Sequence, residues 1–288
     1  MDTASNKTFK LRRLFPVLLL AAALTGCGNS PSPAGPAEAD RSIAELPRGA
    51  VVFERPDGVY RMDLGGRGPV LLAAKGAYPR WSHDGRRVAF VRGRDIMVVD
   101  AAGGEPVALA RADEPRAVAW MPGGKEVLFS DGKKVRGVNV ETRAERDVVS
   151  GYTFRELDVS HDGLQLVATI RGLGPRIRVF DLARGGSREL SAGCSASFSP
   201  DGKLITRNED GHRKLSLVDA ARGKSGGAVH APPGATFDNQ FWSNDPDWIV
   251  SQTEGKSTDL LIHHVPSDRV AQVTRLGDAG RPDLFIER

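Results

Sequence analysis

The stretch "WSHDGRRVAFVRGRDIMVVDAAGGEPVALA" (81–110) contains three short apolar runs separated by turn-forming residues. Related segments recur along the chain, each followed by a second alternating or apolar run. The aromatic or aliphatic residues ahead of these turns are Trp81, Trp120, Val159, Phe198, Trp242 and Phe285, spaced by 39, 39, 39, 44 and 43 residues. A unit of about 40 residues with four short strands is typical of a β-propeller blade.

The two ends of the repeat array complement each other. Residues 50–76 offer a second, third and fourth strand without a first, and residues 280–288 offer a first strand with nothing after it. Joined, the two segments complete one blade. We therefore expect an all-β, six-bladed propeller over residues 47–288, in which the C-terminal strand completes the N-terminal blade and removes the exposed edge that an open array would leave.

The composition suits a globular protein and gives no sign of nucleic-acid binding. The chain has 288 residues, of which 40% are apolar and 26% charged, so it can bury a sizeable core. Its formal net charge is +4, and Lys7, Lys10, Arg12 and Arg13 against Asp2 supply +3 of it within the first 26 residues. The rest of the chain is nearly neutral, so no basic surface for nucleic acid is expected.

The first 26 residues have the pattern of a bacterial signal peptide. A basic stretch leads into the apolar run "LFPVLLLAAALTG" (14–26), which is too short to span a bilayer comfortably. "LTGC" (24–27) resembles the lipobox of bacterial lipoproteins, which implies lipidation of Cys27 and strong membrane anchoring. The alternatives are an ordinary secretory signal or an uncleaved anchor helix. Residues 27–46, rich in Pro, Ala and Gly, are predicted to form a flexible tether.

Several in-register segments carry a family resemblance. The stretch 81–110 and "FSPDGKLI" (198–205) resemble the repeats of TolB-like six-bladed propellers, and the resemblance covers about residues 48–288. It implies a binding protein of the bacterial envelope that uses the propeller face and the central channel. TolB itself carries an α/β domain ahead of its propeller, so we expect a TolB-like propeller lipoprotein and not TolB.

The apparent Ser-His-Asp motif is better explained as a turn. Ser82, His83 and Asp84 are consecutive, as are the residues of "SHD" at 160–162, so their side chains diverge instead of converging as a catalytic triad requires. Proline or asparagine replaces the histidine in other copies, whereas Ser and Asp suit turns. Adjacent His263 and His264 would face opposite sides of a strand, and no residues show zinc-ligand spacing. We therefore expect no catalytic residue, no cofactor and no metal.

A candidate binding site lies at the mouth of the predicted channel. The first strand of each blade lines the propeller axis, so residues at one register form a ring. The residue four places before each repeat residue belongs to this ring. These residues are Ala77, Arg116, Arg155, Cys194, Asp238 and Arg281. The three arginines could hold an acidic peptide or another anionic ligand. The alternative is that they only solvate the funnel, paired with Asp238 and Glu156. Cys194 is expected to be a small buried residue.

The predicted function is that of a non-catalytic, lipid-anchored protein-binding or scaffolding module. An envelope protein or peptide is the expected partner, the lipid attaches the chain to a membrane, and the protein is expected to be a monomer. Because Gly28 follows Cys27 where some lipoproteins have an aspartate that retains them in the inner membrane, the outer membrane is preferred. One alternative is a purely structural lipoprotein. Another is a calcium-dependent hydrolase or lactonase with channel ligands among Glu156, Asp158, Asp238, Asn239 and Asp283.

Overall fold

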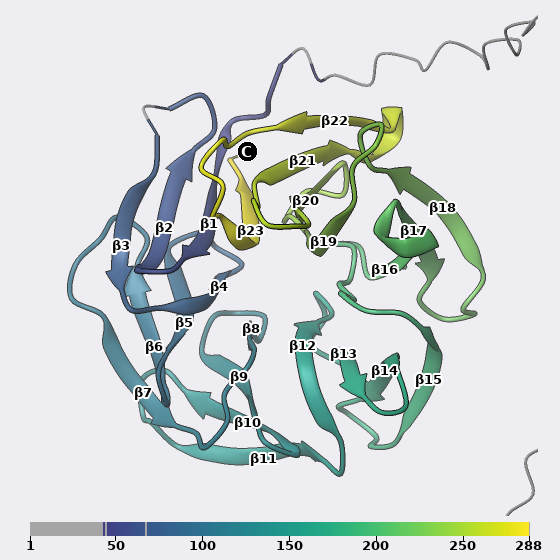
Figure 1. Cartoon of the computed structure of the whole chain (residues 1–288). Coiled ribbons are helices and arrows are strands. Elements are labelled where there is room, and N and C mark those ends of the chain that lie inside the picture. The colour runs from purple at the N-terminus through teal and green to yellow at the C-terminus, as the bar shows by residue number, and fades with distance from the viewer. Residues whose placement is uncertain (1–42, 44, 67, 288) are drawn as a thin grey trace, which may run out of the picture. The chain divides into compact units, whose positions relative to one another are not determined.

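A computed structural model describes residues 43, 45–66 and 68–287, and within them six antiparallel sheets form a ring (Figure 1). Blade 1 has the strand order β23 (Gly280–Ile286), β1 (Gly49–Arg55), β2 (Gly58–Asp63) and β3 (Val70–Ala74). Blade 2 contains β4 (Ala77–Trp81), β5 (Arg87–Arg92), β6 (Asp95–Asp100) and β7 (Val107–Arg111). Blade 3 contains β8 (Val118–Trp120), β9 (Glu126–Asp131), β10 (Lys134–Asn139) and β11 (Glu145–Ser150).

The remaining blades continue around the ring. Blade 4 contains β12 (Thr153–Val159), β13 (Gln165–Arg171), β14 (Pro175–Asp181) and β15 (Ser187–Ala192). Blade 5 contains β16 (Leu204–Glu209), β17 (Lys214–Asp219) and β18 (Ser225–His230), with the 3-10 turn η1 (Asp210–His212) between the first two. Blade 6 contains β19 (Phe237–Trp242), β20 (Trp248–Thr253), β21 (Leu260–His264) and β22 (Arg269–Gln272), with the 3-10 turn η2 (Val265–Ser267) before β22.

The six-bladed prediction and its closure are confirmed. β23 pairs antiparallel with β1, with Leu284 opposite Val51, so the last strand completes the first blade. Five of the six repeat residues mark one structural position, because each of the five pairs with the residue seven places further along the chain. These pairs are Trp81 with Val88, Trp120 with Val127, Val159 with Leu166, Phe198 with Ile205 and Trp242 with Ile249.

Blade 5 departs from the four-strand expectation, because its innermost segment is not a regular strand. Phe198 makes only an isolated bridge to β16. The backbone N–H of Ser195 donates to the carboxylate of Glu156 at 3.1 Å, and that of Ser197 donates to the hydroxyl of Thr206 at 3.0 Å. Side chains thus accept hydrogen bonds from backbone N–H groups that, in a regular strand, would donate to the backbone of the neighbouring strand. Cys194 lies in this irregular segment.

The hydrophobic core lies between neighbouring blades. Leu128 of blade 3 shares one buried cluster with Phe154 of blade 4, and Val52 of blade 1 shares another with Phe90 of blade 2. All four side chains are fully buried. Burying a side chain of this size contributes about 1.5–3 kcal/mol, so the stability of each blade depends on its neighbours.

The Ser-His-Asp segments form turns after the innermost strands. The Ser82 hydroxyl donates to Asp84 at 2.6 Å and accepts a hydrogen bond from the backbone N–H of Arg87 at 2.9 Å. Ser160 and Ser199 repeat this arrangement in blades 4 and 5. Each of these serine hydroxyls thus contacts the turn aspartate directly, without an intervening histidine.

Some sequence-based predictions fall on the N-terminal part of the chain. The predicted signal peptide (1–26), the lipidation site Cys27 and the tether through residue 42 lie outside the described residues. Within the described part of the chain, no helix has the length and apolar character needed to cross a membrane.

Candidate functional site: the central channel

A break in strand pairing shapes the entrance of the channel. In blade 2 the register shifts between Ala77 and Arg80, and in blade 1 the same shift falls between Gly280 and Asp283 of β23. Gly280, not Arg281, therefore occupies the predicted ring position. Arg281 lies one residue further on, in a left-handed backbone conformation. The residues with this conformation at the shift are Tyr78, Ser195, Asn239 and Arg281, with φ between 46° and 56°.

The error in the predicted register has a simple origin. The predicted ring position lies four residues before Phe285, whereas Leu284 is the residue that takes the place of Trp81 in strand pairing. β23 continues past the repeat position to Ile286, so its apolar end offers several candidates for the repeat residue.

The predicted site residues nevertheless line one cavity of about 320 Å³ at this entrance. The predicted residues Arg116, Arg155, Asp238 and Arg281 line it together with Cys194 and His212, and Arg80, Glu156 and Asn239 are further polar residues of its wall. Arg116 and Arg155 are exposed. Arg116 lies 3.7 Å from Glu114, and Arg281 forms an ion pair with Glu54 of β1.

The acidic groups of the entrance have different partners from those expected. Asp238 accepts hydrogen bonds from the Ser195 hydroxyl at 2.7 Å and from the Asn208 amide at 2.8 Å. Burial raises the pKa of Glu156, and Asp238 adds to the rise, whereas the hydrogen bond from the backbone N–H of Ser195 opposes it. Among the described residues, neither Asp238 nor Glu156 forms an ion pair with an arginine of the entrance.

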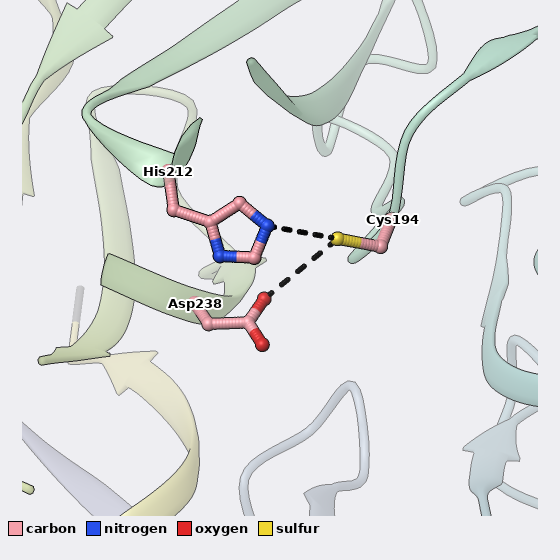
Figure 2. Close-up of side chains that lie close together, drawn as sticks. All are labelled: Cys194, His212 and Asp238. Carbon is pink, nitrogen blue, oxygen red and sulfur yellow. Dashed lines mark hydrogen bonds between the residues drawn. The ribbon is translucent and has the colours of Figure 1, made fainter. Parts of the chain in front are cut away.

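Three side chains of the cavity point toward one another (Figure 2). The sulfur of Cys194 lies 3.6 Å from Nε2 of His212 and 4.0 Å from Oδ1 of Asp238. The candidate ligand atoms of the three residues all lie within 4.8 Å of one another. On its other side, Nδ1 of His212 lies 2.6 Å from Oε1 of Glu254.

Sequence reasoning missed this cluster. Cys194 comes from the irregular segment of blade 5, His212 from the turn η1 and Asp238 from β19 of blade 6. These residues are 18 and 26 positions apart, so no short motif joins them. The available signal was that Cys194 and Asp238 are neighbours in the predicted ring of six.

A layer of one residue from each blade separates this cavity from the other end of the channel. The layer consists of Arg80, Ala119, Asp158, Ser197, Phe241 and Asp283, each directly before a repeat position. The Arg80 guanidinium lies 3.5 Å from the centre of the Phe241 ring. Burial raises the pKa of Asp283 to about 7 and that of Asp158 to about 6, and Arg80 opposes both shifts.

Arg80 also lines a cavity of about 110 Å³ on the far side of this layer, together with Trp81, Trp120 and Trp242. The rings of His83 and His161 meet there with centroids 5.6 Å apart. Burial lowers the pKa of His83, and His161 lowers it further.

The carboxylate and amide side chains proposed as calcium ligands are divided between the two cavities. Asp158 and Asp283 line the far cavity, whereas Glu156, Asp238 and Asn239 line the entrance. Arg80 lines both, so a cation stands between the two sets. Over the described ranges, the group of side chains spaced for a metal ion is Cys194, His212 and Asp238, which includes only one of the five.

Comparisons with known proteins support the fold. No family model matches the chain. TolB from Acinetobacter baumannii superposes with a TM-score of 0.67 at 20% identity, covering 82% of this chain and 66% of that chain. A chain of the nidogen/laminin complex gives a TM-score of 0.68 at 11% identity, covering 82% of this chain and 98% of its own length. The predicted resemblance to TolB-like propellers is thus confirmed for the fold.

A curated relative bears on activity. The protein named "Uncharacterized peptidase YuxL" of Bacillus subtilis (strain 168) is 27% identical over 161 residues, which are 51% of this chain and 24% of that protein. The chain therefore spans about a quarter of the length of this relative. We predicted a protein without enzymatic activity, and the match to a protein named as a peptidase contradicts that prediction.

Proposed function

We propose that this chain is a lipid-anchored propeller of the bacterial envelope that binds an acidic segment of a partner protein at the channel entrance. The observation that carries the proposal is the placement of Arg116 and Arg155. They come from neighbouring blades, are exposed, and line the same cavity. Guanidinium groups bind carboxylates through paired hydrogen bonds, so two adjacent arginines suit an acidic side chain or a chain terminus.

Arg281 has a different role in this proposal. Its ion pair with Glu54 and its position over the Tyr78 ring, 4.4 Å from the ring centre, hold the guanidinium at the cavity wall. It adds positive charge to the entrance while remaining partly neutralised. Arg116 and Arg155 therefore carry most of the expected affinity.

The binding proposal is tested by capture from envelope extract. Arg116, Arg155 and Arg281 are replaced together by serine, and the captured proteins are identified after crosslinking. A charge-matched control replaces three outer arginines, Arg146, Arg176 and Arg222. We expect partner recovery to fall in the entrance variant and to persist in the control. Equal recovery by both variants would refute the proposal.

The lipid anchor is tested separately, because its residues lie outside the described part of the chain. Cys27→Ser should move the protein from the membrane fraction to the soluble fraction, and the wild-type N-terminal peptide should carry acyl chains by mass spectrometry. A wild-type chain with an unmodified Cys27 contradicts lipidation. Preference for the outer membrane is then read from membrane fractionation.

The Bacillus subtilis match favours a second candidate, in which the bound peptide is hydrolysed. The purified full chain is incubated with a peptide library, and new termini are identified by mass spectrometry. Cleavage by the wild-type chain that is lost in the triple entrance variant would support this candidate. An intact library would contradict it and leave the binding proposal in place.

A further inference from the structure

We propose that Cys194, His212 and Asp238 bind a divalent transition metal, and that zinc fits their donor atoms best. This inference does not depend on the proposed peptide binding. Thiolate sulfur, imidazole nitrogen and carboxylate oxygen are the three donor types that zinc takes from proteins. Hard ions such as calcium and magnesium prefer sites made of oxygen alone, so the sulfur and nitrogen donors argue against them.

The distances suit a tetrahedral ion. Zn–S and Zn–N bonds of about 2.3 and 2.0–2.1 Å at a tetrahedral angle place sulfur and nitrogen about 3.6 Å apart. Sγ of Cys194 lies 3.6 Å from Nε2 of His212. The 4.0 Å between Sγ and Oδ1 of Asp238 is slightly longer than a shared zinc ion requires. A small side-chain rotation would close that difference.

The surrounding hydrogen bonds orient the ligands for metal binding. Nδ1 of His212 lies 2.6 Å from Glu254, so an N–H at Nδ1 donates to the carboxylate and leaves the lone pair of Nε2 facing Cys194. A carboxylate behind a ligating histidine is the usual second contact in zinc sites. Ser195 and Asn208 hold the Asp238 carboxylate by two hydrogen bonds. Zinc would therefore meet an oriented imidazole and a fixed carboxylate, and it would share Oδ1 of Asp238 with these two donors.

The carboxylate nearest the Cys194 sulfur favours a bound cation over a nucleophilic thiolate. Cys194, His212 and Glu254 are also arranged like the nucleophile, the base and the orienting carboxylate of a catalytic triad. Reactive thiolates, however, occur in positively charged surroundings. Here the sulfur of Cys194 lies 4.0 Å from the carboxylate of Asp238, and Glu156 lines the same cavity. The same carboxylates would attract a metal ion.

Binding is a simple exchange of a proton for the metal. The S–H bond of Cys194 breaks, the sulfur keeps the electron pair and donates it to zinc, and the proton passes to solvent. All three ligands line the entrance cavity of about 320 Å³. The fourth position of a tetrahedral ion would therefore be open to water or to a bound group.

The test uses the full chain with Cys27→Ser, so that Cys194 is the only thiol. After chelation and dialysis, the protein is titrated with Zn²⁺ by calorimetry and with Co²⁺ by absorption spectroscopy. We expect one Zn²⁺ per chain, and for Co²⁺ a thiolate charge-transfer band with the d–d bands of tetrahedral geometry. A Cys27→Ser chain that takes up neither ion overturns the proposal.

Ligand variants locate the site. Cys194→Ser and His212→Ala should abolish tight binding, and Glu254→Gln should weaken it about 10- to 100-fold. The matched control is His230→Ala, because His230 also faces a carboxylate, at 2.8 Å from Asp268, but lies outside the entrance cavity. Asp238→Asn also perturbs the contacts of Ser195, so the decision rests on His212, whose side chain is 31% exposed. Wild-type affinity in His212→Ala overturns the proposal.

Alkylation separates the metal site from a nucleophilic cysteine. Zn²⁺ should protect Cys194 of the wild type from iodoacetamide and should not protect it in His212→Ala. A thiol that reacts equally fast with and without Zn²⁺ overturns the proposal. Because this readout needs no peptide, failure of metal binding and failure of the proposed function are distinguishable.

Discussion

Asp283 and Trp81 are 202 positions apart and are joined by two hydrogen bonds. The Asp283 carboxylate accepts a hydrogen bond from the backbone N–H of Trp81 at 2.7 Å, and its backbone carbonyl accepts one from the indole N–H at 3.1 Å. The contact ties the C-terminal strand of blade 1 to the innermost strand of blade 2. Asp283 therefore takes part in the closure of the ring and is also one of the buried acidic groups of the channel. Both roles lead to testable predictions.

Closure predicts that the last strand stabilises the whole ring. Leu284 on β23 is 2% exposed, so Leu284→Ala should lower the free energy of unfolding by about 2–5 kcal/mol. The matched control is Leu173→Ala, because Leu173 is fully exposed and should change stability little. Denaturant unfolding measures both. Deletion of residues 280–288 should lower the melting temperature further, and cooperative melting of the truncated chain at the wild-type temperature would contradict the closure.

The raised pKa of Asp283 predicts that stability falls as pH rises from about 4 to about 7. Its ordinary pKa is 3.8, and burial raises it to about 7 in the folded chain. Between these values the folded state keeps a proton that the unfolded state has lost, so stability decreases with increasing pH. Asp283→Asn should flatten this part of the profile while its amide oxygen still accepts from Trp81. An unchanged slope in thermal melts across that range would contradict the assignment.

Arg80 is predicted to stabilise the channel layer. Arg80→Met removes the cation above the Phe241 ring, a contact of about 0.5–2 kcal/mol, and also removes the charge that favours ionised Asp158 and Asp283. We expect lower stability at neutral pH and a smaller loss near pH 4, where these carboxyl groups are protonated. Arg92→Met is the control, since Arg92 lies 5.5 Å from the Phe90 ring and its hydrogen bond is exposed. A loss of stability in Arg80→Met that does not depend on pH would refute the predicted electrostatic contribution of Arg80.

The turn interpretation predicts different effects at two adjacent residues. Ser82→Ala removes the hydroxyl that bonds Asp84 and the backbone of Arg87, and should cost about 0.5–1.5 kcal/mol per hydrogen bond lost. His83→Ala, which removes a ring that contacts His161, should cost less. Denaturant unfolding of both variants measures which substitution lowers the free energy of unfolding more. A larger loss in His83→Ala would contradict the turn role of the serine.

The same type of turn shows which contacts can be predicted from neighbouring residues in the sequence. In blade 4 the Ser160 hydroxyl and the backbone N–H of Leu164 lower the pKa of Asp162. Ser and Asp two positions apart place their side chains together in any such turn, so their contact was predictable. The pairing of Trp81 with Val88 follows in the same way, because a tight turn fixes the register of two consecutive strands.

The register of Arg281 was less predictable. Leu284 and not Phe285 takes the repeat position of β23, and an apolar end such as "LFI" does not show which of its residues does so. The ion pair of Arg281 with Glu54 depends on the closure of blade 1 and joins residues 227 positions apart. Neither feature has a signal in the neighbouring sequence.

The sequence by itself determined the repeat, the blade count and the closing strand, because these depend on short-range turns and on apolar alternation that recurs at about 40 residues. Only the tertiary structure decided which chemical groups meet in the channel. Arg80 reaches Phe241 from another blade, and His212 reaches Cys194 from a turn outside the ring of innermost strands. Such contacts depend on how the blades pack around the axis, and that packing places side chains together without any fixed spacing along the chain.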